Sequence, residues 1–389
     1  MPVTSCSYGD YQDSPDAKVI IVHRPVRYDH SPAVLSSRRP FKAIQTPETA
    51  ADGHLDLPVT IALHPPQPQP QPPSIPLAMT VSTSFRTLRA QVQSFTRRHD
   101  PETPPQIPLG YVVFLSILFT CIYVGVLYLH PLTRPSPKQS RDAPSVIRLR
   151  IRAVYTSCVI TSVSTVYALA VLGGLDLWTS LKYMGIWPLN PLDVIKGLGL
   201  TMILFAGPLA EKFWLDRDPR DNIVMDFKTS VSSWIGWRNY IVGPITEELT
   251  FRSHILALHL SVPDPTLTTL VFFSPLYFGI AHLHHFYEFT LTHPDSSYRF
   301  ALVRSFVQFG YTTFFGWFAA WVYLRYGSLW TAIAVHSFCN VMGLPRFWGA
   351  LEGGMWRTAV YYVILVAGAV GFYHLVIPMT ESDNSLIAL

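Results

Sequence analysis

The hydrophobic positions divide the chain into two parts that predict different structures. From residue 108 onward the sequence consists mostly of long apolar runs, whereas residues 1–107 are polar and rich in proline. An apolar run needs about 20 residues to form a helix that crosses the ~30 Å hydrocarbon core of a bilayer. Leu109–Leu129 meets this requirement without a single charge. The pattern therefore predicts an all-α fold, a polytopic transmembrane helical bundle with a disordered N-terminal tail.

About eight membrane spans are expected from the apolar runs. They cover Leu109–Leu129, Ala153–Leu172, Val194–Ala210, 239–260, 266–285, 301–324, 328–344 and Thr358–Met379. The run His64–Pro76 alternates proline with glutamine, which favours an extended polyproline conformation and buries no core. We therefore expect three regions: a disordered proline-rich tail over 1–107, the helical bundle over 108–380, and a short C-terminal tail over 381–389.

Composition supports a membrane protein and excludes some partners. Of the 389 residues, 49% are hydrophobic and only 14% are charged, whereas a soluble protein carries about 25% charged residues. The formal net charge is +4, and no block of lysine and arginine is long enough to predict a nucleic-acid surface. The four cysteines lack zinc-ligand spacing and suggest no disulfide framework. The lipid bilayer is thus an expected partner and nucleic acid is not.

Ionisable residues inside the fourth apolar run are the first candidates for chemistry. Charged side chains within membrane spans are costly, so they face the bundle interior or a wet cavity. Glu247 and Glu248 are adjacent, and Arg252 lies four residues after Glu248, which lets these two pair across one helical turn. Glu247 then projects about 100° away and is free to face a cavity. The alternative is a helix end at the interface, with both carboxylates in headgroup water.

The fifth apolar run ends in a cluster of histidines. His282 closes a fully apolar stretch and follows Phe278 by four residues, so both side chains share one helix face. His284, His285 and Glu288 lie nearer the aqueous boundary, where an interfacial cap is the expected role. His282, the deepest of the four, is therefore the candidate for chemistry.

The seventh apolar run carries two polar residues on one face. His336 and Asn340 are four residues apart on an otherwise apolar helix. An isolated asparagine in a membrane helix usually serves only to hold helices together, with about 0.6 kcal/mol per hydrogen bond. A histidine and an asparagine that project together instead suggest hydrogen-bond donors aimed at one ligand.

Together these residues predict a hydrolase site that needs no covalent intermediate. Glu247 can take a proton from water while His282 holds that water by a second hydrogen bond. His336 and Asn340 can donate to the oxyanion of a tetrahedral intermediate. The expected reaction is hydrolysis of a peptide or amide bond, with no metal and no cofactor.

Three short motifs in these runs resemble those of the type II CAAX prenyl endopeptidases, in the wider CPBP/ABI intramembrane protease family. An EExxxR motif stands at Glu247, Glu248 and Arg252, an FxxxH motif at Phe278 and His282, and an HxxxN motif at His336 and Asn340. The three occur in the order typical of that family. The segment Ser140–Arg150 also resembles the loop after the first span in eukaryotic members.

This resemblance implies a substrate and a location. Members of that family remove the last three residues from proteins farnesylated or geranylgeranylated at a C-terminal CAAX cysteine, in the endoplasmic reticulum membrane. The resemblance assigns water activation to Glu247 and His282, oxyanion binding to His336 and Asn340, and orientation of these residues to Glu248 and Arg252. The expected partners are the C-termini of prenylated CAAX proteins and the bilayer.

Other interpretations remain open from the sequence alone. A zinc protease would use the cluster of His282, His284, His285 and Glu288, but this cluster lacks histidines at i,i+4 and the chain has no HExxH motif. A thiol protease would use Cys339 with His336 at i,i+3. A transporter could also carry buried charges, although no internal repeat is evident. A protease for non-prenylated peptides would keep the same four catalytic residues.

Overall fold

The computed structural model describes residues 106–137, 139–215, 228–229 and 231–387. Most of these residues are helical, and within them the only extended pairing is an isolated bridge between Ser136 and Gln139. The predicted all-α class is confirmed. The predicted disordered tail over 1–107 lies outside the described residues, except for its last two positions.

Helices of very different length make up the described part of the chain. In order they are α2 (Leu109–Leu129), α3 (Pro144–Tyr167), η1 (Ala168–Leu172), α4 (Leu177–Tyr183), α5 (Pro191–Leu204), α6 (Ala206–Ala210), η2 (Glu211–Leu215), α8 (Trp234–Gly236), η3 (Trp237–Val242), α9 (Gly243–Glu248), η4 (Leu249–Leu256), α10 (Ala257–Leu260), η5 (Thr269–Phe273), α11 (Leu276–Ala281), α12 (His284–Thr292), α13 (Tyr298–Tyr326), α14 (Leu329–Met342) and α15 (Met355–Met379). The η segments are π-helical, a geometry that is rare and often found at functional sites.

The predicted multi-pass class is supported, but the predicted number of eight spans is not confirmed. In the part of the chain that the structure describes, three helices are long and apolar enough to cross a bilayer: α2, α3 with η1, and α15. The pair α5 and α6–η2, bent by 81°, raises the number to four if it counts as one span. The predicted spans over 239–260 and 266–285 are instead divided into short helical segments, and α14 has only 14 residues. Three arginines reduce the apolar character of α13.

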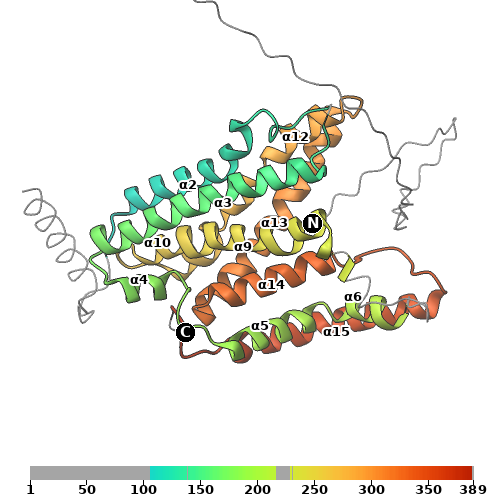
Figure 1. Cartoon of the computed structure of the whole chain (residues 1–389). Coiled ribbons are helices and arrows are strands. Elements are labelled where there is room, and N and C mark those ends of the chain that lie inside the picture. The colour runs from blue at the N-terminus through green and yellow to red at the C-terminus, as the bar shows by residue number, and fades with distance from the viewer. Residues whose placement is uncertain (1–105, 138, 216–227, 230, 388–389) are drawn as a thin grey trace, which may run out of the picture. The chain divides into compact units, whose positions relative to one another are not determined.

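The helices pack in layers (Figure 1). α2 and α3 lie side by side, α9 packs between α3 and α14, and α14 packs in turn against α5, which pairs with α15. Bulky side chains from distant elements meet in the interior, including Phe119 of α2, Phe251 of η4 and Phe278 of α11. The segment α9–η4, which carries the predicted carboxylates, thus lies inside the bundle.

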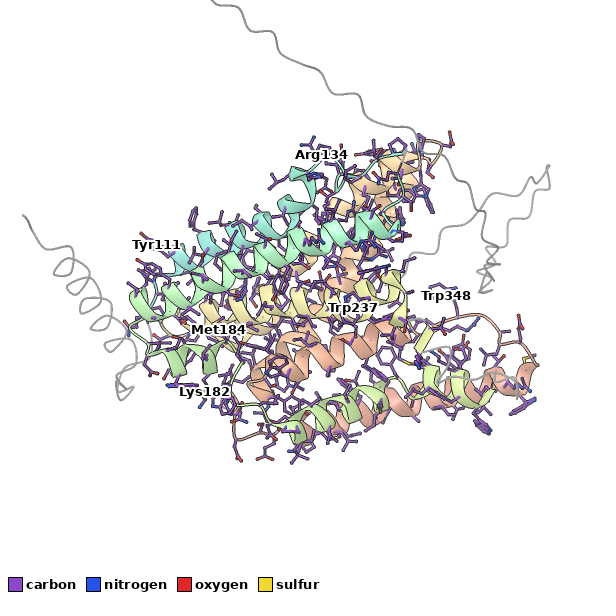
Figure 2. All side chains as sticks on the ribbon, in the orientation of Figure 1. Tyr111, Arg134, Lys182, Met184, Trp237 and Trp348 are labelled. Carbon is purple, nitrogen blue, oxygen red and sulfur yellow. The ribbon has the colours of Figure 1, made fainter. Side chains whose placement is uncertain are left out.

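Apolar side chains also cover the outer faces of several helices. Phe114 on α2 is 60% exposed, Val163 on α3 67%, Phe306 on α13 74% and Val363 on α15 68%. Figure 2 shows Tyr111 at the outer side of α2. Large exposed apolar surfaces mark contact with lipid or partners, so these faces fit a bilayer.

Both ends of the described region pack against the bundle. Ile107 is fully buried, and its N–H donates to the Ser261 carbonyl. At the other end, the N–H of Leu386 donates to the Leu324 carbonyl of α13, and the Ser382 hydroxyl donates to Asp193 of α5. The described C-terminal residues therefore connect α5 with α13.

Candidate active site

The two adjacent glutamates end helix α9 and have different surroundings. Pro244 stands in the first turn of α9, where its missing N–H is tolerated. Glu248 is fully buried, and its Oε1 lies 3.0 Å from Nη1 of the equally buried Arg252. The side chain of Glu247 is 24% exposed and lines a cavity. The predicted i,i+4 ion pair is therefore confirmed, and the two carboxylates point to different places.

Two aromatic rings hold the Arg252 guanidinium. Its Cζ lies 4.5 Å from the centroid of the Phe278 ring and 5.8 Å from that of Phe315. Nη2 also donates to the Gly316 carbonyl at 3.5 Å. Cation–π contacts of this kind stabilise a desolvated guanidinium by about 2 kcal/mol. Phe278, predicted as a supporting residue, therefore helps to fix the cation that orients Glu248.

His336 lies between the two carboxylates. Its Nδ1 is 2.7 Å from Glu248 Oε1, and its Nε2 is 3.6 Å from Glu247 Oε2. An ionised carboxylate only accepts hydrogen bonds, so Nδ1 carries a proton and donates to Glu248. This leaves Nε2 directed towards Glu247 and the cavity. The sequence did not predict these contacts, because they join two helices that are far apart along the chain.

His282 follows the last residue of α11 and is fixed by its own helix. Its Nδ1 lies 2.7 Å from the Phe278 carbonyl oxygen. A carbonyl only accepts, so Nδ1 is protonated and Nε2 is left to bind a ligand. The ring also packs edge-on against Phe278, with 4.6 Å between centroids. The FxxxH spacing thus fixes both the tautomer and the position of this histidine.

Asn340 is fixed by a backbone contact from another element. Its Nδ2 donates to the Asn239 carbonyl of η3 at 2.9 Å. The amide has a second N–H, and Asn340 lines the same cavity as His336. Asn239 was missed by the sequence analysis, because its contribution is a carbonyl oxygen and no side-chain pattern marks it.

One cavity of about 230 Å³ brings the predicted residues together. Glu247, His282, His336, Asn340 and Phe278 all line it. Glu248 and Arg252 do not reach its surface and lie behind Glu247 and His336. The residues that were predicted to do chemistry are therefore at the cavity, and those predicted to orient them are outside it.

A second charged cluster lies at the same cavity. Glu288 of α12 is buried, and its carboxylate contacts Arg141 at 2.9 Å, Arg150 at 3.0 Å and His285 Nδ1 at 3.0 Å. Burial alone would raise the pKa of Glu288, but the His285 hydrogen bond and the charges of both arginines outweigh it and hold the pKa well below its usual range. The residue predicted as an interfacial cap thus ties α12 to the α2–α3 connection and to α3.

Three side chains in this part of the cavity wall carry atoms that could bind a metal ion. The ligand atoms of His284, His285 and Glu288 lie within 4.8 Å of one another. However, both oxygens of Glu288 already contact guanidinium groups, and Glu288 Oε2 also accepts a hydrogen bond from His285 Nδ1. A cation here would have to displace two arginines, so the group fits a metal poorly.

Cys339 also lines the cavity, but the neighbouring histidine has other contacts. His336 donates through Nδ1 to Glu248 and directs Nε2 at Glu247. Neither ring nitrogen is left to take a proton from the Cys339 thiol. The arrangement therefore fits water activation better than a thiol nucleophile.

Known proteins resemble this chain in sequence. Residues 229–342, which include every predicted site residue, match the model of the family described as "Type II CAAX prenyl endopeptidase Rce1-like". The chain is 38% identical to a probable CAAX prenyl protease 2 of Schizosaccharomyces pombe, over 67% of this chain and 91% of that protein. The chain belongs to the type II CAAX prenyl endopeptidase family.

Relatives in other kingdoms of eukaryotes support the assignment to this CAAX endopeptidase family. CAAX prenyl protease 2 of Homo sapiens is 34% identical over 72% of this chain and 88% of its own length. The protein of the same name from Arabidopsis thaliana is 29% identical over 71% of this chain and 91% of its own. No solved structure matches the chain significantly.

Proposed function

We propose that this chain is an endopeptidase of the endoplasmic reticulum membrane that removes the C-terminal aaX tripeptide from farnesylated or geranylgeranylated CAAX proteins, Ras-like GTPases among them. The observation that carries the proposal is the cavity lined by Glu247, His282, His336 and Asn340 inside an apolar helical bundle. The relatives named as CAAX prenyl proteases support the same substrate class.

In the proposed reaction, water attacks the carbonyl carbon of the prenylated cysteine. Glu247 accepts a proton from the water, and His282 Nε2 holds the water by a second hydrogen bond. The new C–O bond gives a tetrahedral oxyanion. Glu247 then returns its proton to the leaving nitrogen, the C–N bond breaks, and the products are a prenylcysteine carboxylate and a free tripeptide. This route uses neither a metal nor a cofactor.

His336 and Asn340 are proposed to bind the oxyanion. The Nδ1 proton of His336 is already committed to Glu248, so a donor towards the cavity must come from Nε2–H of the imidazolium form. Asn340 adds its second Nδ2–H. Glu248 and Arg252 thereby act on the reaction through His336.

The prenyl chain is proposed to lie along the apolar wall of the cavity. Leu127 of α2, Ile151 and Val154 of α3, and Val242 of η3 line this wall. Because lipid tails are as apolar as this wall, the isoprenoid is held there by packing contacts and gains little from the hydrophobic effect. An intramembrane site suits such a substrate because the lipid anchor need not leave an apolar environment.

The test is release of the tripeptide from a farnesylated CAAX peptide in membranes of a host that lacks its own CAAX endopeptidases. We expect cleavage by the wild type and none by Glu247→Gln or His282→Ala. Glu352→Gln, an exposed glutamate outside the cavity, is the matched control and should cleave normally. A folded wild type that leaves the peptide intact would overturn the substrate assignment. Membrane fractionation tests the location.

A further inference from the structure

The cavity wall is rich in arginine, and one arginine differs from the rest. Arg141, Arg150, Arg238 and Arg304 all line the cavity. The first two contact Glu288, and Arg238 Nη1 lies 2.8 Å from Asp142. Among the described residues, Arg304 has no carboxylate within ion-pair distance. It is therefore a cation with its donors free.

The surroundings of Arg304 favour an anionic ligand. Its guanidinium stacks on the ring of Phe289, with Cζ 4.6 Å from the centroid, which leaves its edge donors open. Nearby, the single carboxylate of Glu288 faces two guanidinium groups, so this end of the cavity carries further positive charge. Arginine presents a planar fork of donors that matches a carboxylate.

Helix α13 sets the distance between Arg304 and the proposed reaction centre. Residues of one helix face line the cavity: Arg304, Gln308, Tyr311, Thr312 and Phe315. The ring of Phe315 packs against the ring of His336, with 4.5 Å between centroids. Eleven residues separate Arg304 from Phe315, which corresponds to about 16 Å along the helix.

The length of a substrate of the proposed kind fits this distance. Three extended residues beyond the scissile bond span about 10 Å. The difference of about 6 Å is no longer than an arginine side chain. An anion at the end of a tripeptide would thus reach the guanidinium while the scissile carbonyl lies beside His336.

We propose that Arg304 binds the free C-terminal carboxylate of the CAAX substrate and so selects chain ends of the correct length. The inference rests on the proposed function, because it assumes that a tripeptide occupies this part of the cavity. Internal peptide segments carry no carboxylate at that distance and would leave Arg304 without a partner. Arg304 is a specificity residue and takes no part in the bond-breaking step.

The test compares two farnesylated peptides of identical sequence, one with a free C-terminal carboxylate and one with a C-terminal amide. The wild type should prefer the acid, with a KM roughly tenfold lower than for the amide, because hydrogen bonds to charged groups contribute more than neutral ones. Arg304→Gln should raise KM for the acid by about the same factor and leave its kcat unchanged. Both constants for the amide peptide should stay the same, so the preference for the acid should disappear. Arg304→Lys should restore part of it.

The matched control is Arg299→Gln. Arg299 lies on the same helix and is exposed, but it does not line the cavity. Its loss removes the same charge and should not change the acid-to-amide ratio. If Arg304→Gln lowers the cleavage rate of both peptides equally, Arg304 has a structural or lipid-contacting role and the inference is overturned. Failure of the wild type to cleave the acid would instead overturn the proposed function.

Discussion

Two buried carboxylate clusters lie near the cavity, an inner cluster around Glu248 and an outer cluster around Glu288, and they have similar members but different hydrogen bonding. Glu248 and Glu288 are both buried and each contacts arginine and histidine. At Glu288 both oxygens are occupied, Oε1 by Arg150 and Oε2 by Arg141 and His285. At Glu248 a single oxygen accepts from both Arg252 and His336, and Oε2 has no partner among the described residues.

This difference separates a structural cluster from a functional one. A buried polar atom without a partner costs about 1–3 kcal/mol, so a fold tolerates it mainly where geometry serves another purpose. Around Glu288, both carboxylate oxygens have partners, and three separate elements are held together. Around Glu248, the geometry holds His336 at a defined position next to Glu247. Four predictions test this comparison, from the largest expected effect to the smallest.

The largest effect is expected for Glu247, the carboxylate next to the inner cluster. Glu247→Gln keeps the size of the side chain but removes the proposed base, which should lower kcat for the farnesylated peptide by about 10²–10⁴-fold. The unfolding temperature in detergent should remain close to that of the wild type. A variant with normal kcat would contradict the assignment of the base.

Breaking the inner ion pair should reduce stability strongly. Arg252→Ala leaves the Glu248 carboxylate buried without its cation, which typically costs about 3–5 kcal/mol. Arg141→Ala in the outer cluster should cost about 1 kcal/mol or less, since Arg141 is 36% exposed and Arg150 still neutralises Glu288. Thermal unfolding of both variants measures the difference. Equal losses would show that the two clusters do not differ in the way described.

The outer cluster should give a smaller effect that depends on pH. The pKa of Glu288 is lowered in the folded protein, so its stabilisation is fully present above the ordinary glutamate pKa and is lost as the pH falls. Glu288→Gln should therefore destabilise the protein by about 1–3 kcal/mol at pH 7. The difference in the free energy of unfolding between this variant and the wild type should be smaller near pH 4 than at pH 7. A difference that stays constant with pH would argue against an ionised Glu288.

The smallest effects are expected for the thiol and metal alternatives. Cys339→Ser and a strong chelator should each change kcat by less than about twofold, a difference below 0.5 kcal/mol. Both treatments use the same peptide assay. Loss of activity with the chelator would point to His284, His285 and Glu288 as a metal site, and loss with Cys339→Ser would point to a thiol nucleophile.

Local spacing predicted the parts of the site that lie within one helix. The i,i+4 rule predicted the pairing of Glu248 with Arg252. The FxxxH spacing predicted only that Phe278 and His282 share a helix face, and the hydrogen bond from His282 to the Phe278 carbonyl is an addition from the structure. The contact of His336 with Glu248 depends on how α14 packs against α9, and no periodicity encodes that packing.

Hydrophobic runs predicted the fold class better than the number of spans. Apolar length identified α2, α3 and α15 as membrane helices, because each is continuous. The predicted fourth and fifth spans are apolar as well, but they contain the polar residues of the site and are broken into short helical segments. The cost of burying an arginine such as Arg252 is offset by partners from other elements. The mean hydropathy of a sequence segment does not include such partners.

The π-helical segment η4 sets a limit on how the gene can change. A π-helix closes its turns with i→i+5 hydrogen bonds and thus holds more residues per turn than an α-helix. Removing one codon within Leu249–Leu256 would leave too few residues for the π-helical turns, so either the winding of the segment or the position of the residues after it would have to change relative to Glu247. Small insertions and deletions are tolerated far better in surface connections. The length of η4 is therefore as much a part of the site as the identity of its residues.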